Sequence, residues 1–333
     1  MKFENTFVDD SFEKQALIVA YPHDSSEWGG FLKAAQSEFL FFVQKFIENT
    51  QEKLICFVPP SATQELKDFF NQFDNIRYEL LELTYSDIWL RDLSPKFFLK
   101  KEKMQALCFD FNSYGNKFQL NKDSIFYHEI LKRFPMPSHW TKFILEGGAF
   151  EFGKNFEVFS TCEAVLNKNR NPNLEKEELE KFFQELGIKD GHFFERGLLG
   201  DHTDGHVDNL LRVHGKTLLA ASAPQGHPQY FVCEELKEKL PSNYEVHFIE
   251  LPDERDSSGE VLPLSYLNYV FFNGVVFLPV FNEAVFDEKA IAVFQKVFAG
   301  AVILPCPSRN ITEGGGGSLH CMSVEIPNFI GDN

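Results

Sequence analysis

Short apolar runs alternate along the chain with longer stretches in which apolar residues recur every three or four positions. The runs are rich in β-branched and aromatic residues and are bounded by Pro or Gly, as in QALIVAYP at residues 15–22 and KLICFVPP at 53–60. Such runs indicate strands, whereas the 3.6-residue period of the stretch between them, at 31–48, indicates an amphipathic helix. The pattern therefore predicts a repeated unit of strand, helix and strand.

Five such units are predicted, and the second reuses the last strand of the first. Units of this kind build either one parallel doubly-wound sheet or blades around a pseudo-symmetry axis. Because no linker or low-complexity segment divides the chain, we expect a single α/β domain over residues 1–333. The predicted strand, helix and strand of each unit are 15–22, 31–48 and 53–60; 53–60, 62–73 and 75–83; 155–165, 175–187 and 192–195; 216–224, 230–240 and 244–251; 274–282, 283–298 and 301–307.

The composition is that of a globular protein with an aromatic core, since 44% of the 333 residues are apolar and 38 are Phe. The net charge of −17 argues against a nucleic-acid or anionic-membrane partner and is compatible with attraction of a small cation. The charged N-terminal stretch lacks the apolar segment of a signal peptide, and no run of about 18 apolar residues occurs. Since the six cysteines form no C-x-x-C pair, we expect a cytoplasmic protein with free thiols.

A run of four glycines at residues 314–317 precedes Cys321 near the end of the chain. A packed strand or helix gains nothing from such a run, because each Gly loses more entropy on folding than Ala would. The run predicts a bare backbone ledge whose N–H groups lower the pKa of the Cys321 thiol. The other five cysteines lie in apolar or helical contexts and are expected in the core. The alternative is a flexible linker.

The segment SDIWLRDLSP at residues 86–95 places Asp87, Arg91 and Asp92 close to Trp89. A carboxylate beside an aromatic face suits a planar cation. The alternative is a surface turn ended by Pro95. Glu146 precedes two glycines in a similar way, which by itself is equally typical of a strand end.

The segment GDHTDGHVDN at residues 200–209 contains His202, His206 and Asp208. If the chain is extended from Gly205 onward, His206 and Asp208 face the same side and form an acid/base pair. The alternatives are structural histidines or a metal site made of His202, His206 and Asp208. The H-x3-H spacing binds metal on a helix, and Gly205 argues against a helix here.

Taken together and in this order, six motifs resemble the agmatine deiminase and bacterial-type peptidyl-arginine deiminase family of the guanidine-modifying pentein superfamily. The sequence departs from the family pattern at two positions. The family usually has Gly at the position of Ser94, before Pro95, and Asn at the position of Ser318, two residues before His320. The motifs are D-x-W-x-R-D at 87–92, E-G-G at 146–148, N-x-N-R-N-P at 167–172, T-D-G-H-V-D-N at 203–209, S-Y-x-N at 265–268 and G-G-G-x-x-H-C with a following I-P at 315–327.

The resemblance implies a five-bladed pseudo-symmetric α/β propeller, the pentein fold, that needs no metal or organic cofactor and forms a homodimer. It implies a small cationic guanidine substrate. The implied roles are Cys321 as nucleophile, His206 as general acid/base, Asp92 and Asp208 as guanidinium ligands, Glu146 as support for His206, Trp89 at the entrance, and Asn268 and Gly316 in substrate binding.

The expected reaction is hydrolysis of agmatine to N-carbamoylputrescine and ammonia through a covalent Cys321 thiouronium. The alternatives are deimination of peptidyl or free arginine, amidino transfer, a metallohydrolase, and a binding scaffold without activity. Agmatine is favoured because the chain has no Arg between Arg91 and Arg133 to hold an α-carboxylate. The residues expected at the tail of the substrate are Asp110, Asn112, Tyr114 and Asn116, with Lys117 as the one exception.

Overall fold

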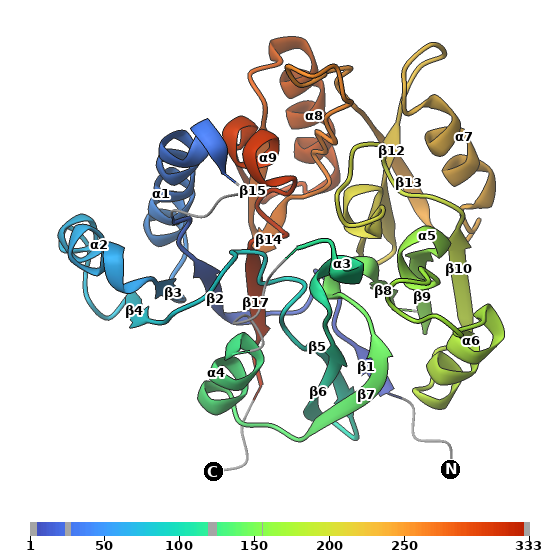
Figure 1. Cartoon of the computed structure of the whole chain (residues 1–333), viewed down its shortest axis with the longest axis horizontal. Coiled ribbons are helices and arrows are strands. Elements are labelled where there is room, and N and C mark those ends of the chain that lie inside the picture. The colour runs from blue at the N-terminus through green and yellow to red at the C-terminus, as the bar shows by residue number, and fades with distance from the viewer. Residues whose placement is uncertain (1–4, 24–27, 119–124, 155, 330–333) are drawn as a thin grey trace.

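The computed structural model describes residues 5–23, 28–118, 125–154 and 156–329. These residues form five separate mixed sheets, which follow one another around the molecule in Figure 1. The alternative prediction of one doubly-wound parallel sheet is therefore wrong. In every sheet, a central strand pairs antiparallel with one neighbour and parallel with another, which it reaches through a helical connection.

One sheet joins the two ends of the chain, since the late strand β17 (Ser323–Pro327) runs antiparallel to the early strand β2 (Lys14–Ala20). On the other side of β2 lie β3 (Lys53–Val58) and β4 (Tyr78–Glu82), both parallel to it. The connecting helices are α1 (Leu32–Asn49) and α2 (Thr63–Phe70), each preceded by a short 3₁₀ turn, η1 (Gly29–Phe31) and η2 (Pro60–Ala62). The first two predicted units thus share one sheet.

The sheet that the sequence pattern did not predict contains β1 (Asn5–Phe7), β5 (Lys96–Lys100), β6 (Lys103–Asp110) and β7 (Ser138–Ile144). Strand β1 pairs antiparallel with β5, and α4 (Ile125–Arg133) leads into β7. Between β6 and α4 lies a turn labelled α3 (Ser113–Asn116).

The third, fourth and fifth predicted units each occupy a sheet of their own. Every one of these sheets gains an antiparallel strand that precedes the predicted unit: β8 (Glu151–Gly153), β11 (Leu211–His214) or β14 (Val270–Phe272). The predicted elements are β9 (Glu157–Thr161), α6 (Lys176–Glu185) and β10 (Asp190–Phe194); β12 (Thr217–Ser222), α7 (Tyr230–Lys239) and β13 (Glu245–Glu250); β15 (Val275–Val280), α8 (Ala284–Val297) and β16 (Val302–Pro307). The end of the strand predicted over 155–165 is wrong, because residues 162–165 form the short helix α5 (Cys162–Val165).

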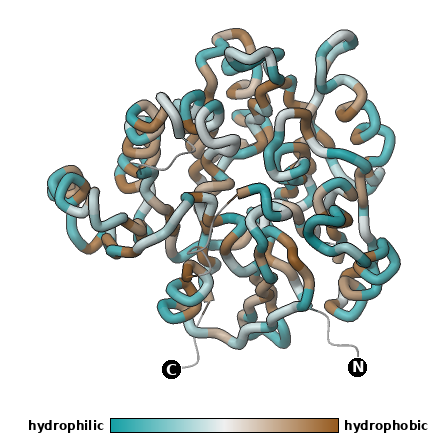
Figure 2. The backbone as a smooth tube through the Cα atoms, viewed as in Figure 1, coloured by the Kyte–Doolittle hydropathy of each residue, from teal (hydrophilic) through white to brown (hydrophobic). Residues whose placement is uncertain are grey.

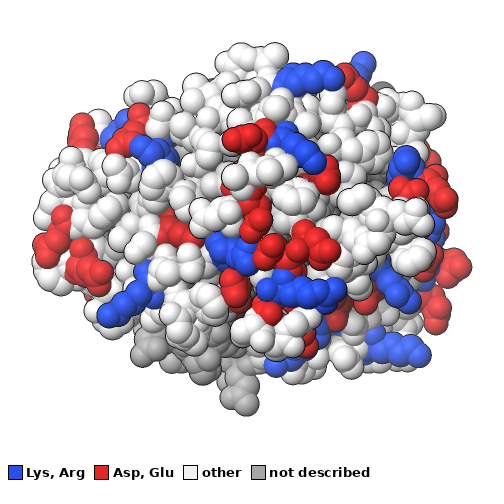
Figure 3. Space-filling view, turned by 90° about the horizontal axis from the view of Figure 1, so that it is seen from above, with Lys and Arg blue, Asp and Glu red and all other residues white. Residues whose placement is uncertain are grey.

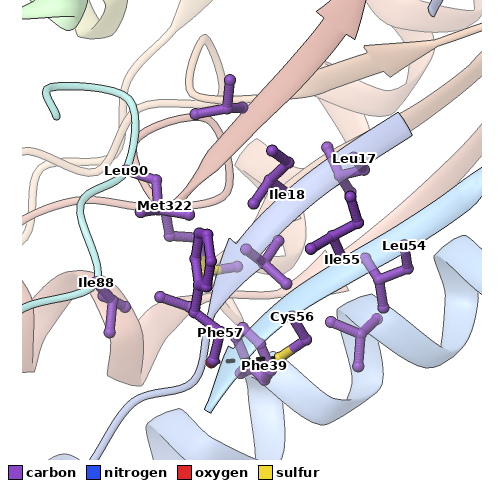
Figure 4. Packing of buried hydrophobic residues seen from close by; sticks show 14 of the residues in the cluster. Leu17, Ile18, Phe39, Leu54, Ile55, Cys56, Phe57, Ile88, Leu90 and Met322 are labelled. Carbon is purple, nitrogen blue, oxygen red and sulfur yellow. Dashed lines mark hydrogen bonds between the residues drawn. The ribbon is translucent and has the colours of Figure 1, made fainter. Parts of the chain in front are cut away.

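The core connects directly to the segments that carry the candidate chemistry. Phe39 of α1 and Phe57 of β3 belong to one buried cluster with Leu90 and Met322 (Figure 4). Leu90 lies two residues before Asp92, and Met322 follows Cys321. Burial of these apolar side chains therefore fixes the backbone on which the reactive groups stand.

Apolar and polar residues are sorted as expected for such a fold. Hydrophobic positions follow the strands and the inner sides of the helices, and hydrophilic positions follow their outer sides (Figure 2). On the face in Figure 3, Lys and Arg side chains lie among Asp and Glu side chains. In the described ranges, no helix combines the length and hydropathy that crossing a bilayer requires.

Candidate active site

A pocket of about 200 Å³ opens beside Cys321. Aromatic rings make up much of its wall, including Trp28 and Trp89, whose ring centroids lie 6.3 Å apart. Two acidic residues, Asp87 and Asp92, also line it. Of the residues that the structure describes, no Lys or Arg contributes to the lining. The pocket therefore suits a narrow cation with an apolar stem.

The predicted nucleophile lies at the inner end of this pocket. The Cys321 sulfur is 3.6 Å from Oδ2 of Asp208 and accepts a hydrogen bond of 3.0 Å from the Asn268 side-chain amide. Oδ1 of Asn268 accepts the Cys321 backbone N–H at 3.1 Å. Asn268 thus fixes Cys321 through two hydrogen bonds. It was predicted to bind substrate, but it is not among the residues that line the pocket.

The thiol differs from the prediction in its electrostatics. Burial raises the pKa of Cys321 well above its ordinary value, and the Asp208 and Asp92 carboxylates raise it further. Hydrogen bonds from the Asn268 side-chain amide and from the Ser318 backbone N–H, directly after the glycine run, lower the pKa of the thiol as predicted, but burial and the two carboxylates outweigh them. A cation placed between the two carboxylates would counteract their effect on the thiol.

The glycine run is also organised differently from the prediction. Gly314 and Gly315 are the last residues of α9 (Arg309–Gly315), and Gly316 ends the helix with a φ of 85°. A Cβ atom on Gly315 or Gly317 would lie 2.6 Å from the Trp89 ring. Gly residues are therefore required here so that the backbone can approach Trp89, and Gly316 lines the pocket as predicted.

Asp208 is fully buried next to Cys321 and, like Asn268, is not among the residues that line the pocket. It belongs to the 3₁₀ turn η4 (Val207–Asn209), so the condition that the chain is extended from Gly205 onward is not met beyond His206. Oδ2 of Asp208 is 2.8 Å from Nδ1 of His320, whereas Oδ1 is buried and has no hydrogen-bond partner among the described residues. Burial, together with the nearby Asp92, raises the pKa of Asp208 to about 7.

Asp92 is the second carboxylate of the site. Its Oδ1 accepts the Gly148 backbone N–H at 2.8 Å, and its Oδ2 accepts the Tyr114 hydroxyl at 3.0 Å. Burial raises the pKa of Asp92, and Glu146 raises it further, although these two hydrogen bonds and His206 oppose the shift. Tyr114 lies in the turn α3, where Ser113, Tyr114 and Asn116 all have positive φ.

His206 lies between two carboxylates and is fully buried. Nδ1 is 3.4 Å from Oδ1 of Asp92, and Nε2 is 3.6 Å from Oε2 of Glu146. Burial alone would lower the pKa of His206, but Asp92 and Glu146 outweigh it and raise this pKa to about 9. The imidazole is therefore protonated at neutral pH and can donate a proton.

Glu146 is held by Arg170, a residue for which no role was predicted. The Nε–H group of Arg170 contacts both carboxylate oxygens of Glu146, and Nη1 contacts Asp204 at 2.6 Å. Burial raises the pKa of Glu146, but His206 and Arg170 reverse the shift and leave it lowered. Arg170 is the Arg of N-x-N-R-N-P, and His320 is the His of G-G-G-x-x-H-C. Both residues belong to motifs that carry the family resemblance, but no role was predicted for either of them.

Gly148 explains how three of these groups come together. A Cβ atom at this position would lie 2.7 Å from Nδ1 of His206, 2.9 Å from Oδ1 of Asp92 and 3.1 Å from Oδ2 of Asp208. The E-G-G motif therefore supplies both the carboxylate of Glu146 and the space in which the other groups meet.

The metal alternative finds no support in the arrangement of side chains. His202 lines the pocket next to Gly316, whereas His206 lies behind it. Among the residues described, no group of three or more His, Cys, Asp or Glu side chains is placed to hold a metal ion.

The predicted tail contacts are mostly wrong. Asp110 and Asn116 are exposed, and the Asn112 side chain binds the backbone of Asn169 and Gly115. Only Tyr114 lines the pocket. Lys117 contacts Asp204 and donates to the carbonyl of His202 at 2.9 Å, so its charge is paired.

Comparisons with known proteins agree with this geometry. The model of the Porphyromonas-type peptidyl-arginine deiminase family matches residues 6–327. The agmatine deiminase of Ectopseudomonas mendocina is 29% identical over 347 residues, which cover 93% of this chain and 92% of that protein.

Solved structures show the same fold. A Cys-to-Ser variant of the C. jejuni agmatine deiminase with substrate bound has a TM-score of 0.86 at 24% identity, covering 98% of this chain and 97% of that one. An amidinotransferase from Microseira wollei is more distant, with a TM-score of 0.56 at 12% identity and 98% of both chains covered.

Proposed function

The chain belongs to the Porphyromonas-type peptidyl-arginine deiminase family, and we propose that it is an agmatine deiminase. The reaction is hydrolysis of the agmatine guanidinium to N-carbamoylputrescine and ammonia. The observation that carries the proposal is that Asp92 and Cys321 line a pocket that Trp28 and Trp89 flank, with His206 and Asp208 buried directly behind them.

Binding localises the charge of a group that is a poor electrophile. A guanidinium between Asp92 and Asp208 donates paired hydrogen bonds to both, and the unpartnered Oδ1 of Asp208 is available for one of them. The same cation offsets the negative charge beside Cys321, so that substrate binding lowers the pKa of the thiol. The reactive thiolate therefore forms only where its target is already bound.

The first half-reaction forms the covalent intermediate. The Cys321 thiolate attacks the central guanidinium carbon and forms a C–S bond. Protonated His206 donates its proton to one terminal nitrogen, the C–N bond breaks, and ammonia leaves. An S-alkylthiouronium remains on Cys321, and His206 is neutral.

The second half-reaction uses water. Neutral His206 accepts a proton as the oxygen of water bonds to the thiouronium carbon. The C–S bond then breaks, releasing N-carbamoylputrescine and restoring the thiolate. His206 keeps the proton that it accepted, and the second proton of the water molecule passes to solvent, where it protonates the departed ammonia. Glu146, held by Arg170, stabilises the imidazolium at both stages.

Agmatine is favoured over arginine by the pocket itself. The described lining has acidic residues and no Lys or Arg, so an α-carboxylate would lose its hydration without gaining a cationic partner. Lys117, the nearest candidate partner, is engaged with Asp204.

The arrangement of the five sheets, the oligomeric state and the cellular location are also proposals. We infer a five-bladed propeller around the site, supported by five sheets that each have a central strand with one antiparallel and one parallel neighbour. A homodimer and a cytoplasmic location follow from the family resemblance and the unpaired cysteines.

The test is an agmatine assay with separate detection of ammonia and the ureido product. Equal amounts of both products, with no requirement for an added amine, are expected. A product in which the amidino group has moved to an amine would instead make the protein a transferase.

A further inference from the structure

His320 lies directly behind Asp208 and has no part in the steps above. Its side chain is buried, with Nδ1 2.8 Å from Oδ2 of Asp208. Its backbone N–H donates to the carbonyl of Asn268 at 3.0 Å, and its own carbonyl accepts from Nε of Arg91 at 3.3 Å. The ring is therefore held in a fixed place relative to the carboxylate.

The surroundings keep His320 uncharged. Burial lowers its pKa well below the ordinary value, and Arg212, Arg91 and Lys96 lower it further. A neutral imidazole carries a single N–H. When Asp208 is ionised its carboxylate can only accept, so that N–H then lies on Nδ1 and points at Asp208. The partners of the three cations are Asp10 and Glu151 for Arg212, Glu325 for Arg91, and the carbonyl of Phe150 for Lys96.

The two oxygens of Asp208 differ as a result. Oδ2 accepts from His320 and is the oxygen nearest the Cys321 sulfur, whereas Oδ1 has no hydrogen-bond partner among the described residues. We propose that His320 is a positioning residue, which holds Oδ2 so that Oδ1 faces the substrate and Asp208 stays available in its ionised form. The identity of that substrate as a guanidinium rests on the proposed function.

The hydrogen bond from His320 favours the ionised carboxylate, so its loss should raise the pH at which Asp208 gains its charge. Other groups also set this pH and would stay in place when His320 alone is changed. They are His206 and Arg212, which favour the charge, and Asp92 and Asp201, which oppose it. The Cys321 thiol also faces Oδ2.

Three substitutions separate the hydrogen bond from the packing of the ring. The side-chain amide in His320→Asn can place an N–H near the position of Nδ1. In His320→Gln the amide lies one methylene further out, near Nε2, and His320→Leu has no donor. The readouts are kcat and KM for agmatine from pH 5 to pH 10, with the thermal midpoint of each variant as the control for folding.

We expect His320→Leu and His320→Gln to lose about 10- to 100-fold in kcat/KM, mostly through KM, as for a lost hydrogen bond to a charged group. In both variants, the acidic limb of the kcat/KM profile should move to higher pH. His320→Asn should lose less than about fivefold in kcat/KM, and the acidic limb of its profile should stay in place. An unmoved limb in His320→Leu, or equal losses in the Asn and Gln variants, would refute the proposal. If His320→Leu does not fold, the Asn and Gln variants decide.

A second readout does not depend on agmatine turnover. 2-Chloroacetamidine is an amidinium electrophile from which the Cys321 thiolate displaces chloride to give a thioether, and iodoacetamide is a neutral counterpart. His320→Gln should slow alkylation by the amidinium reagent about tenfold or more relative to iodoacetamide, and His320→Asn should not. Equal slowing with both reagents would contradict the role of His320. Absence of agmatine turnover in the unaltered protein would contradict only the proposed function.

Discussion

The Nε–H group of Arg170 lies 2.7 Å from Oε1 and 2.9 Å from Oε2 of Glu146, and both side chains are buried. Glu146 in turn faces His206, so Arg170 acts on the general acid through one intermediate carboxylate. Arg170 also joins the segment that carries Asp204 and His206 to the segment that carries Glu146.

We predict that Arg170→Gln lowers the free energy of unfolding by about 3–5 kcal/mol, because it leaves a buried carboxylate without its charge partner. The double variant with Glu146→Gln should recover part of this loss. Urea denaturation of the two single variants and the double variant measures the coupling. Strictly additive losses would show that the pair is not energetically coupled.

Cys321→Ser should fold normally and lose activity by about three orders of magnitude or more, because this site cannot ionise an alcohol as it can a thiol. The matched control is Cys306→Ser, since Cys306 is buried in β16 outside the site. The assay is kcat on agmatine. Activity retained in the first variant, or lost only in the second, would remove Cys321 as the nucleophile.

The pH profile of kcat/KM should be bell-shaped. Activity rises as Asp208 loses its proton near pH 7 and gains the charge that binds the guanidinium. It falls as His206 loses its proton near pH 9, because ammonia then lacks its proton donor. Because the carboxylates and the imidazole titrate together, the two apparent pKa values of the profile belong to the coupled group and not to single residues. A profile that is flat from pH 6 to pH 10 would contradict both assignments.

Asp208→Asn should make the protein inactive but more stable at pH 8. The folded pKa of Asp208 lies above the unfolded value, so the folded state keeps this proton more readily, and stability is lost as pH rises through about 7. Removing the charge should raise the free energy of unfolding at pH 8 by roughly 2 kcal/mol, with little change at pH 4. The control is Asp190→Asn at the exposed first residue of β10, for which the change in the free energy of unfolding should stay within about 0.5 kcal/mol. Destabilisation of Asp208→Asn at pH 8 would contradict this account.

Agmatine should have a kcat/KM at least about a hundredfold above that of free arginine and of a peptide ending in arginine. Lys117→Ala should not narrow this ratio, because the Lys117 ammonium is paired with Asp204. Comparable rates on the peptide would place the protein among peptidyl-arginine deiminases.

The sequence pattern predicted the units whose central strands are buried and whose helices are amphipathic. It missed the sheet of β5, β6 and β7 because β7 is largely exposed and lacks an apolar run. The turn between β5 and β6 uses Lys101 and Glu102 at positive φ, where Asn or Gly would have indicated a hairpin. The motifs predicted Cys321, His206, Asp92, Asp208 and Glu146, which the structure brings together.

The sequence could not show which of these residues contact one another within the site. That Arg170 binds Glu146, and that His320 binds Asp208, depends on approaches between segments far apart in the chain. The raised pKa of Cys321 likewise follows from burial next to two carboxylates, which no local pattern of residues reveals.

The pairing of β17 with β2 has a consequence for synthesis on the ribosome. Ser323 pairs with Val19, roughly 300 positions earlier, so the sheet around β2 lacks a strand until translation has nearly passed the whole length described here. The edge of β2 stays open during that time and can pair with other chains. The nucleophile lies directly before the strand that completes this sheet, so a nascent chain gains its reactive thiol only when β2 is about to be protected.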